Sequence, residues 1–305
     1  MKLNLSGVAL GALMVGLVAS GTAKADAIGF SSLVFSTAFF SAPGTTTPVD
    51  ISTSIQFTNL ADTLTNSATF NGVGAPSVVA SRNQSNPTAT VDPTMVAIGS
   101  YSGGQNNFGF TSTNTNFTRS DSLLTGSVAT GTAASSTVSE TQVLNGNSGT
   151  SDTRSKDASQ EVFTATSNLS LQFNVGGTLA LFAETYNSTN QSQTADASVA
   201  FSVTLTDQTA GTTALTFSPS DLNNSVSSLS TPSSQGSTTP SSFFLASDAF
   251  TLISGHTYKL TINQETNTDA TAVPEPGTLA LFGAGLAGLG FLGFRRQKKS
   301  GGLAA

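Results

Sequence analysis

The sequence predicts an all-β fold, an antiparallel β-sandwich with long loops rich in serine, threonine and asparagine. Two observations carry this prediction. Apolar and polar residues alternate with a period of two in several segments, and helical periodicity is nearly absent between residues 26 and 262. Serine and threonine account for 45 and 46 of the 305 residues, and this composition favours strands and turns over helices.

The strand signals can be placed in order along the chain. The clearest is at residues 49–58, where apolar side chains from Val49 to Phe57 alternate with polar ones. Two pairs of strands are predicted to form hairpins, one around Gly176 and Gly177 and the last around residues 254–257. We expect strands over 49–58, 169–175, 179–183, 199–205, 250–253 and 258–262.

The segments between these strands are expected to be loops. Residues 83–116 are rich in Asn, Gly and Pro, residues 129–159 are mostly small and polar, and residues 218–242 are dominated by Ser and Thr. Of the 20 phenylalanines, 17 precede the C-terminal tail and are the expected core material. Residues 26–262 are therefore predicted to form one exported β-rich domain, and no fixed-period repeat indicates a solenoid.

Composition excludes several classes of function. With one histidine and no cysteine, the chain has no thiolate nucleophile, disulfide, cysteine-based metal site or multi-histidine metal site. Residues 26–274 hold 5 basic and 16 acidic residues, a net charge of −11. An acidic body without a basic stripe does not bind nucleic acid by its net field. We expect no cofactor and no nucleic-acid partner.

The N-terminus has the layout of a secretory signal peptide. Lys2 precedes an apolar run over residues 5–18, which we expect to be helical, and residues 23–25 read Ala-Lys-Ala. Small residues at these positions predict cleavage between Ala25 and Asp26, so residues 1–25 form the signal peptide. The run is about 14 residues long and too short to span a membrane comfortably.

The C-terminus consists of a linker followed by a three-part segment that resembles a membrane anchor. A polar stretch over residues 263–272 is expected to be an extended linker that holds the following segment off the domain. Residues 278–294 form an apolar run that would reach about 26 Å as a transmembrane helix. Flanking it are Val273, Pro274, Glu275, Pro276 and Gly277 on one side, and Arg295, Arg296, Gln297, Lys298 and Lys299 on the other.

This tripartite tail, residues 273–299, resembles the PEP-CTERM sorting signal of Gram-negative bacteria. The resemblance implies processing by exosortase, a membrane-embedded cysteine protease, with recognition by Val273, Pro274, Glu275 and Pro276. The basic residues Arg295, Arg296, Lys298 and Lys299 would stay cytoplasmic, so the precursor would be anchored transiently in the inner membrane. Residues 300–305 extend beyond the usual end of such signals.

Few residues suggest catalysis or ligand binding. His256 is the only candidate for a neutral-pH base, and it lies in a predicted turn without a nucleophile at a recognisable spacing. The carboxylates are spread singly; a glycosidase pair is not excluded by the sequence and not indicated by it. Residues 152–157 pair their two aspartates with Arg154 and Lys156, and no calcium-loop motif occurs.

We therefore expect an exported, non-catalytic protein of the cell surface or extracellular matrix. Family analogy associates such proteins with exopolysaccharide, attached glycans, biofilm and floc formation. The alternative is a carbohydrate- or calcium-binding adhesin module, although tryptophan is absent and the three tyrosines are scattered. A secreted hydrolase is a third interpretation.

Overall fold

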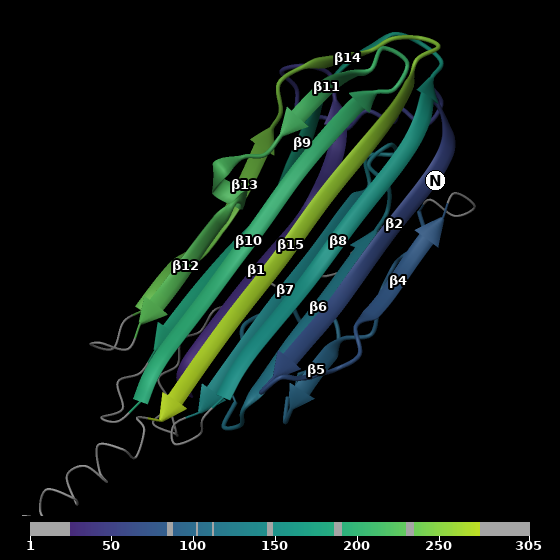
Figure 1. Ribbon diagram of the computed structural model, residues 1–305. Coiled ribbons are helices and arrows are strands. Elements are labelled where there is room, and N and C mark those ends of the chain that lie inside the picture. Colours follow the sequence, from purple (N-terminus) through teal and green to yellow (C-terminus); the bar gives the residue numbers. More distant parts are fainter. Residues whose placement is uncertain are drawn as a thin grey trace, which may run out of the picture.

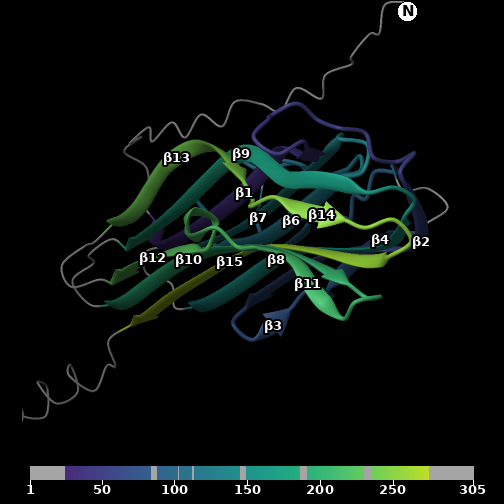
Figure 2. The same cartoon turned by 90° about the horizontal axis from the view of Figure 1, so that it is seen from above.

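Two antiparallel sheets of seven and eight strands form the described part of the chain (Figure 1). The computed structural model describes residues 25–83, 88–101, 103–111, 113–144, 149–185, 191–229 and 235–274. The two sheets lie face to face as two layers (Figure 2), so the predicted all-β, antiparallel fold is confirmed. Within these residues the only helical element is a single 3-10 turn, η1 (Ser220–Leu222).

The strands of each sheet come from the whole length of the chain. The seven-stranded sheet contains β1 (Ala25–Ser41), β5 (Val96–Gly99), β6 (Phe117–Thr125), β7 (Ala133–Leu144), β9 (Leu169–Thr185), β13 (Gln235–Ala246) and β14 (Phe250–Leu252). The eight-stranded sheet contains β2 (Ile55–Phe70), β3 (Val73–Gly74), β4 (Val78–Asn83), β8 (Gly149–Ala165), β10 (Gln191–Asp207), β11 (Thr212–Phe217), β12 (Asn224–Leu229) and β15 (Thr257–Pro274).

The first and last strands are both internal strands of their sheets. The order in one sheet is β13-β9-β1-β7-β6-β5, with β14 also paired to β9. The order in the other is β11-β10-β15-β8-β2-β3, with β12 paired to β10 and β4 to β2. Thus β1 and β15 are each hydrogen-bonded on two sides.

The predicted linker over residues 263–272 is wrong. These residues form the second half of β15 and pair with both neighbours, Glu265 for example with Ala200 of β10 and Lys156 of β8. The segment looks like a linker because both faces of the strand are polar here: Gln264, Thr266 and Thr268 are buried in the polar interior, and the residues between them lie on the outer face. The β-rich domain therefore extends to Pro274, and no described spacer separates it from the sorting signal.

Two of the three predicted loops contain long strands. Residues 129–159 hold β7 and much of β8, and residues 218–242 hold η1, β12 and part of β13. The prediction is wrong because small hydroxyl residues also suit a strand covered on both faces, and every residue from 135 to 143 is buried. In the third segment, the described residues between 88 and 116 are irregular apart from β5 and an isolated bridge at Val91.

The hairpin predicted around Gly176 and Gly177 is instead one continuous strand, β9. A Cβ atom at Gly177 would lie 1.9 Å from the backbone oxygen of Val34 in β1. A bulge in β1 between Phe35 and Thr37 lies at the same level. The glycine thus allows two strands to approach closely and does not mark a turn.

Two further strand predictions need correction. The strand predicted over 49–58 begins only at Ile55, because the backbone N–H groups of Val49 and Ile51 donate to Phe40 and Ala129 and residues 52–54 form a turn. The last two predicted strands are not a hairpin: β14 pairs with β9, whereas β15 pairs with β10 and β8 in the other sheet. The strand predicted over 199–205 is confirmed as part of β10.

The interior is apolar between β9 and β10. Phe173 of β9 and Phe201 of β10 are each no more than 1% exposed. The ring of Phe35 meets Phe201 edge-on, with centroids 4.7 Å apart. Each such buried aromatic side chain contributes about 1.5–3 kcal/mol through removal of apolar surface from water.

Between β6, β7, β8 and β15 the interior is polar. Ser139 Oγ of β7 donates to the backbone oxygen of Thr266 in β15 at 2.9 Å, and Thr153 Oγ1 of β8 donates to that of Arg119 in β6, also at 2.9 Å. Hydroxyl side chains of each sheet therefore bond to the backbone of the other. This arrangement satisfies buried polar groups and gives a structural role to the high serine and threonine content.

Candidate functional site

The predicted sorting signal begins at the end of β15. Val273 and Pro274 pair through their backbones with Ser192 and Gln191 of β10, and Pro274 is the last residue of the strand. The rest of the signal lies outside the described residues, namely Glu275, Pro276, the apolar run 278–294, Arg295, Arg296, Lys298 and Lys299. Their roles stay predictions, and the part of the chain that is described contains no helix able to span a membrane.

The predicted signal-peptide cleavage site lies at the start of β1. Ala25 is the first residue of that strand and its backbone pairs with Leu144 of β7. Cleavage between Ala25 and Asp26 would leave the rest of β1 in place. Residues 1–24 of the predicted signal peptide lie outside the described residues, so its cleavage stays a prediction.

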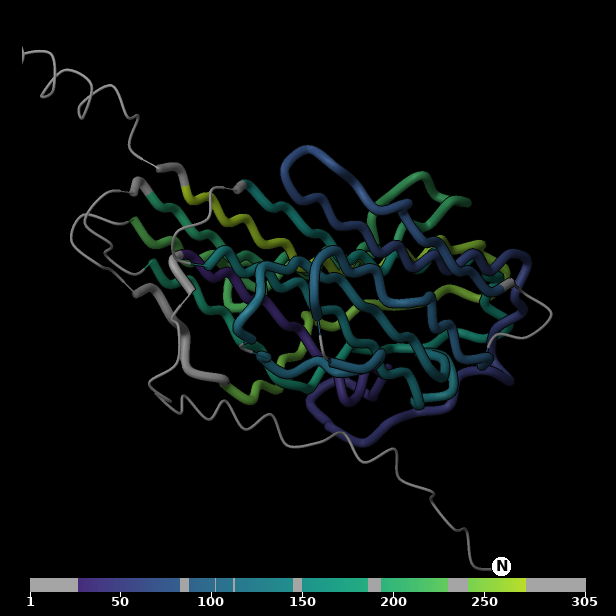
Figure 3. Tube along the Cα trace, turned by 90° about the horizontal axis from the view of Figure 1, so that it is seen from below, coloured from purple at the N-terminus to yellow at the C-terminus, as the bar shows by residue number. Residues whose placement is uncertain are grey.

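The start of β1 and the end of β15, where the described part of the chain begins and ends, lie at the same end of the sandwich. Ala27 of β1 and Ala270 and Ala272 of β15 belong to one buried cluster built from alanines and Val143. Figure 3 shows the purple start of β1 and the yellow end of β15 on the same side of the molecule. The two segments predicted to reach the membrane therefore join the domain at one end.

Small side chains bring the two sheets close together near this end. A Cβ atom on Gly29 of β1 would lie 2.7 Å from the backbone oxygen of Asp196 in β10 and 3.1 Å from Thr268 Cβ in β15. Only glycine fits at this distance. The absence of a side chain at Gly29 thus allows β1 to lie close to the sheet that carries the sorting signal.

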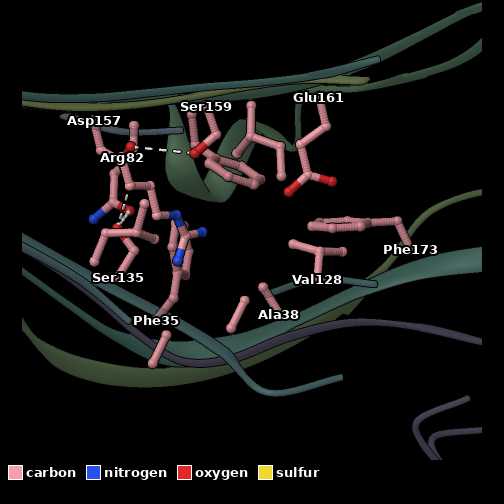
Figure 4. Close-up of a pocket in the computed structure, with 15 residues that line it drawn as sticks. Phe35, Ala38, Arg82, Val128, Ser135, Asp157, Ser159, Glu161 and Phe173 are labelled. Atoms are coloured by element: carbon pink, nitrogen blue, oxygen red, sulfur yellow. Dashed lines mark hydrogen bonds between the residues drawn. The ribbon is translucent and has the colours of Figure 1, made fainter. Parts of the chain in front are cut away.

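A group of charged side chains is buried inside the sandwich (Figure 4). Asp62 on β2 forms an ion pair with Arg82 on β4, and both side chains are at most 5% exposed. Asp157 and Glu161 on β8 face the same interior and are each 4% exposed. Three carboxyl groups thus lie near one guanidinium group away from water, and the guanidinium group forms its ion pair with Asp62.

Burial changes the protonation of two of these carboxyl groups. It raises the pKa of Asp157 to about 7, where a hydrogen bond from Ser135 to the ionised carboxylate opposes the rise and the charge of Asp62 adds to it. Burial likewise raises the pKa of Glu161 to about 7, with a further rise from Asp62 and opposition from Arg82. Near neutral pH, both groups are therefore partly protonated.

A cavity of about 30 Å³ lies beside this group, lined among others by Phe35, Ser135, Glu161, Phe173 and Gln264. The Glu161 carboxyl group points across it toward Phe173 (Figure 4). Such a volume accommodates one or two water-sized groups. It is too small for a sugar ring, so these carboxyl groups do not form an open glycosidase-type cleft.

A second buried ion pair holds a surface segment onto the seven-stranded sheet. Arg119 Nε lies 2.7 Å from Glu140 Oε2, and neither side chain is exposed. The guanidinium group also donates to the backbone oxygens of Asn107 at 2.5 Å and Gly109 at 2.7 Å. The neighbouring Phe110 ring packs on this face, so the pair fastens the segment to the sheet.

The outer face of the eight-stranded sheet is open, and no described segment crosses it in Figure 1. Asp196, Asp269 and Asp152 lie directly opposite one another on β10, β15 and β8. Burial raises the pKa of Asp269, and the charges of Asp152 and Asp196 raise it further. Even so, no group of three or more His, Asp or Glu residues in the described ranges could hold a metal ion.

His256 lies in the turn before β15, as predicted, and it is paired. Its Nδ1 atom is 2.7 Å from Asp207 Oδ2, and Asp207 Oδ1 accepts the backbone N–H groups of Thr209 and Ala210. These hydrogen bonds outweigh burial and lower the pKa of Asp207. Asp207 supplies an orienting group, but no hydroxyl of the described residues is hydrogen-bonded to the ring, and the pair fits a turn brace.

The residue-by-residue sequence interpretation missed the interior carboxyl groups. Within residues 152–157, Arg154 and Lys156 point outward, and Arg154 pairs with Glu265 at 2.6 Å, whereas Asp157 points inward. The basic neighbours therefore do not compensate Asp157. No local signal separates the two faces of this strand, because Arg154, Lys156 and Gln160 at the even positions are polar as well.

Comparison with known proteins concerns the tail. The model of the PEP-CTERM protein-sorting motif matches residues 272–297. No curated protein and no solved structure matches the chain. The resemblance drawn from the tail is confirmed, and the matched range begins at Ala272, within β15. The motif implies an exported protein of a Gram-negative bacterium, with a membrane-anchored precursor that exosortase processes.

Proposed function

We propose that the mature protein is a non-catalytic component of the cell surface or extracellular matrix, acting in exopolysaccharide-associated biofilm or floc structure. The observation that carries this proposal is the sorting motif at the end of β15, an internal strand. The start of β1 lies at the same end of the sandwich, in the cluster of Ala27 and Ala272. Anchored there, the precursor would present its remaining surface away from the membrane.

Several features support a structural role over a catalytic one. The chain has one histidine and no cysteine, and His256 braces a turn through Asp207. The buried carboxyl groups of Asp157 and Glu161 border a cavity too small for a sugar. Long strands with two-sided pairing suit a durable extracellular scaffold.

The test of sorting is the intact mass of the protein in membrane and surface fractions. We expect a surface form that begins near Asp26 and lacks residues 278–299. Replacing Pro274 and Pro276 by Ala should retain the full tail, because two prolines hold the segment extended and keep the following helix from growing over it. The matched control is Pro76→Ala, an exposed proline outside the motif.

A wild-type surface form that still carries residues 295–299 would contradict sorting by exosortase and leave a simple tail anchor. The biological role requires a separate test. Deleting the gene should reduce cell aggregation, and the wild-type gene, but not the variant with both prolines replaced, should restore it. Unchanged aggregation after deletion would contradict the matrix role while leaving the sorting result intact.

The alternative is a carbohydrate- or calcium-binding adhesin module. The open polar face of the eight-stranded sheet favours it, because Thr, Ser, Asn and Asp side chains there offer hydrogen-bonding groups in regular rows. A glycan array with and without chelator distinguishes this alternative. Absence of both sugar-specific and calcium-dependent binding would exclude it.

A further inference from the structure

A series of hydrogen bonds joins the two sheets, and the positions of its oxygen and nitrogen atoms indicate which of them carries a proton. Ser135 Oγ of β7 lies 2.7 Å from Asp157 Oδ2 of β8 and 2.8 Å from Gln264 Oε1 of β15. Both neighbours are oxygen atoms. A serine hydroxyl has only one proton, so it cannot donate to both.

The orientation of the Gln264 amide is fixed by its other contacts. Its Nε2 atom lies 2.6 Å from the backbone oxygen of Leu33 in β1 and 3.1 Å from Thr137 Oγ1 in β7. Exchanging the amide oxygen and nitrogen would place two oxygen atoms 2.6 Å apart at Leu33. Gln264 therefore presents its oxygen to Ser135 and needs a donor there.

Among these side chains, the assignment that gives every oxygen a donor has a neutral Asp157. A protonated Asp157 donates to Ser135 Oγ, Ser135 donates to Gln264 Oε1, and Gln264 donates to Leu33. We propose that this proton on Asp157 holds the two sheets together through the hydrogen bonds from Asp157 to Ser135 and from Ser135 to Gln264. Its loss therefore weakens the contact between β7 and β15.

The surrounding charges favour the neutral acid. Asp62 faces Asp157 from β2 and Arg82 faces it from β4. Glu161 lies on the same face of β8, four residues further along the strand. Leu33 of β1, Ser135 of β7 and Gln264 of β15 contribute no charge. On the neighbouring β6 and β7, the charged residues Arg119, Asp121 and Glu140 point to the opposite face of their sheet, toward the segment containing residues 106–111.

The charge balance of the group gives the same direction. With Asp157 and Glu161 neutral, Asp62 and Arg82 compensate one another. With both ionised, the interior would hold two uncompensated negative charges, which burial strongly disfavours. The raised pKa of about 7 for Asp157 agrees with the geometry.

The sign of the pH effect follows from this direction. The pKa of Asp157 is raised from 3.8 to about 7 in the folded state, so the folded state binds more protons than the unfolded state between these values. The resulting stabilisation is fully present below pH 3.8 and is lost as the pH rises to about 7. Within the native state, these hydrogen bonds between the sheets are lost as Asp157 ionises near pH 7.

The test compares purified full-length wild-type protein with Asp157→Asn by urea unfolding at pH 5 and pH 8. The amide of asparagine supplies a permanent donor to Ser135. We expect the unfolding equilibrium constant of the wild type to rise relative to that of the variant by about tenfold or more between pH 5 and pH 8. Asp248→Asn, which changes an exposed carboxyl group, is the matched control and should leave the pH dependence unchanged.

Hydrogen–deuterium exchange locates the effect. After correction for intrinsic rates, wild-type peptides covering β7 and the middle of β15 should lose protection between pH 5.5 and pH 8.5, and those of Asp157→Asn should not. Glu161→Gln should keep this local change, since Glu161 lies outside the hydrogen-bonded chain. Ser135→Ala should lower protection at pH 5.5 and abolish its pH dependence, which decides the matter even if the asparagine variant does not fold.

Two results would overturn the proposal. Lower stability of Asp157→Asn at pH 8 would mean that an ionised carboxylate is needed as the acceptor for Ser135. An unchanged pH dependence of exchange in Asp157→Asn or in Ser135→Ala would mean that the proton does not connect the sheets.

Discussion

The hydroxyl group of Ser139 on β7 is hydrogen-bonded to the backbone oxygen of Thr266 on β15, 2.9 Å away and in the opposite sheet. Both residues are fully buried. The backbone oxygen of a paired strand thus accepts a further bond from across the interior. In this half of the sandwich, serine and threonine connect the layers in the way that interlocking apolar side chains do elsewhere.

Ser139→Ala tests whether these bonds stabilise the fold. The substitution keeps the strand and removes one buried donor, so we expect the free energy of unfolding to fall by about 1 kcal/mol. Urea unfolding measures the change, with Ser227→Ala on the exposed face of β12 as the control. Equal stability of the two variants would show that the bonds between sheets contribute little.

Gly29→Ala tests the close approach of the sheets. The added Cβ would meet the backbone oxygen of Asp196 at 2.7 Å, and neither strand can move without disturbing its ladder. We expect a loss of about 1–3 kcal/mol in thermal or urea unfolding. At Gly74 on β3 the nearest atom would be 3.8 Å away, so Gly74→Ala should change stability little. An unchanged free energy of unfolding for Gly29→Ala would mean that the two sheets can move apart at this point at little cost.

The sequence was sufficient to predict the fold class, because alternation in β10 and in the first half of β9 is strong and helical periodicity is absent. It was also sufficient for the tail, where Pro274, Glu275 and the basic cluster are local signals. Neither inference depends on knowing which strands are neighbours.

Other features depend on contacts between distant residues. Nothing local distinguishes Ser135–Ser139, buried on both faces, from an exposed loop of the same composition. The hydrogen bonds of Ser135 with Asp157 and Gln264 join residues as far as 129 positions apart in the sequence. The polar half of β15 resembles a linker by composition, and only its pairing with β8 and β10 makes it a strand.

Arg119→Met tests the ion pair beneath residues 107–109. It would leave Glu140 buried without its guanidinium partner, and such changes lower stability by about 3–5 kcal/mol. Arg154→Met removes a pair with Glu265 in which the arginine side chain is 52% exposed, so its effect should stay below about 1 kcal/mol. Urea unfolding compares the two, and limited proteolysis should cut the Arg119 variant first near Asn107. Similar losses in both variants would contradict this ranking.

Asp269→Asn tests the row of aspartates on the open face. Asp269 lies between Asp152 and Asp196, and like charges directly opposite in a sheet destabilise it. We expect a gain of roughly 0.5 kcal/mol at pH 7. The folded-state pKa of Asp269 is raised above 3.8, so the repulsion destabilises the protein only at pH values where Asp269 is ionised. The gain in stability should therefore vanish near pH 3. A gain that persists at pH 3, or in high salt, would show that charge repulsion is not its origin.

The last prediction concerns the absence of a spacer between β15 and the motif. Val273 and Pro274 are still paired with β10, so a protease that binds the motif as an extended chain must first release the end of this strand. Inserting about ten Gly and Ser residues after Ala272 would move the motif about 17 Å on average from the sheet. In pulse-chase measurements we expect the inserted form to lose its tail faster than wild type. The same insertion after Gly211, in an exposed turn, should leave the rate unchanged. Equal rates for all three proteins would mean that the end of β15 opens faster than processing occurs.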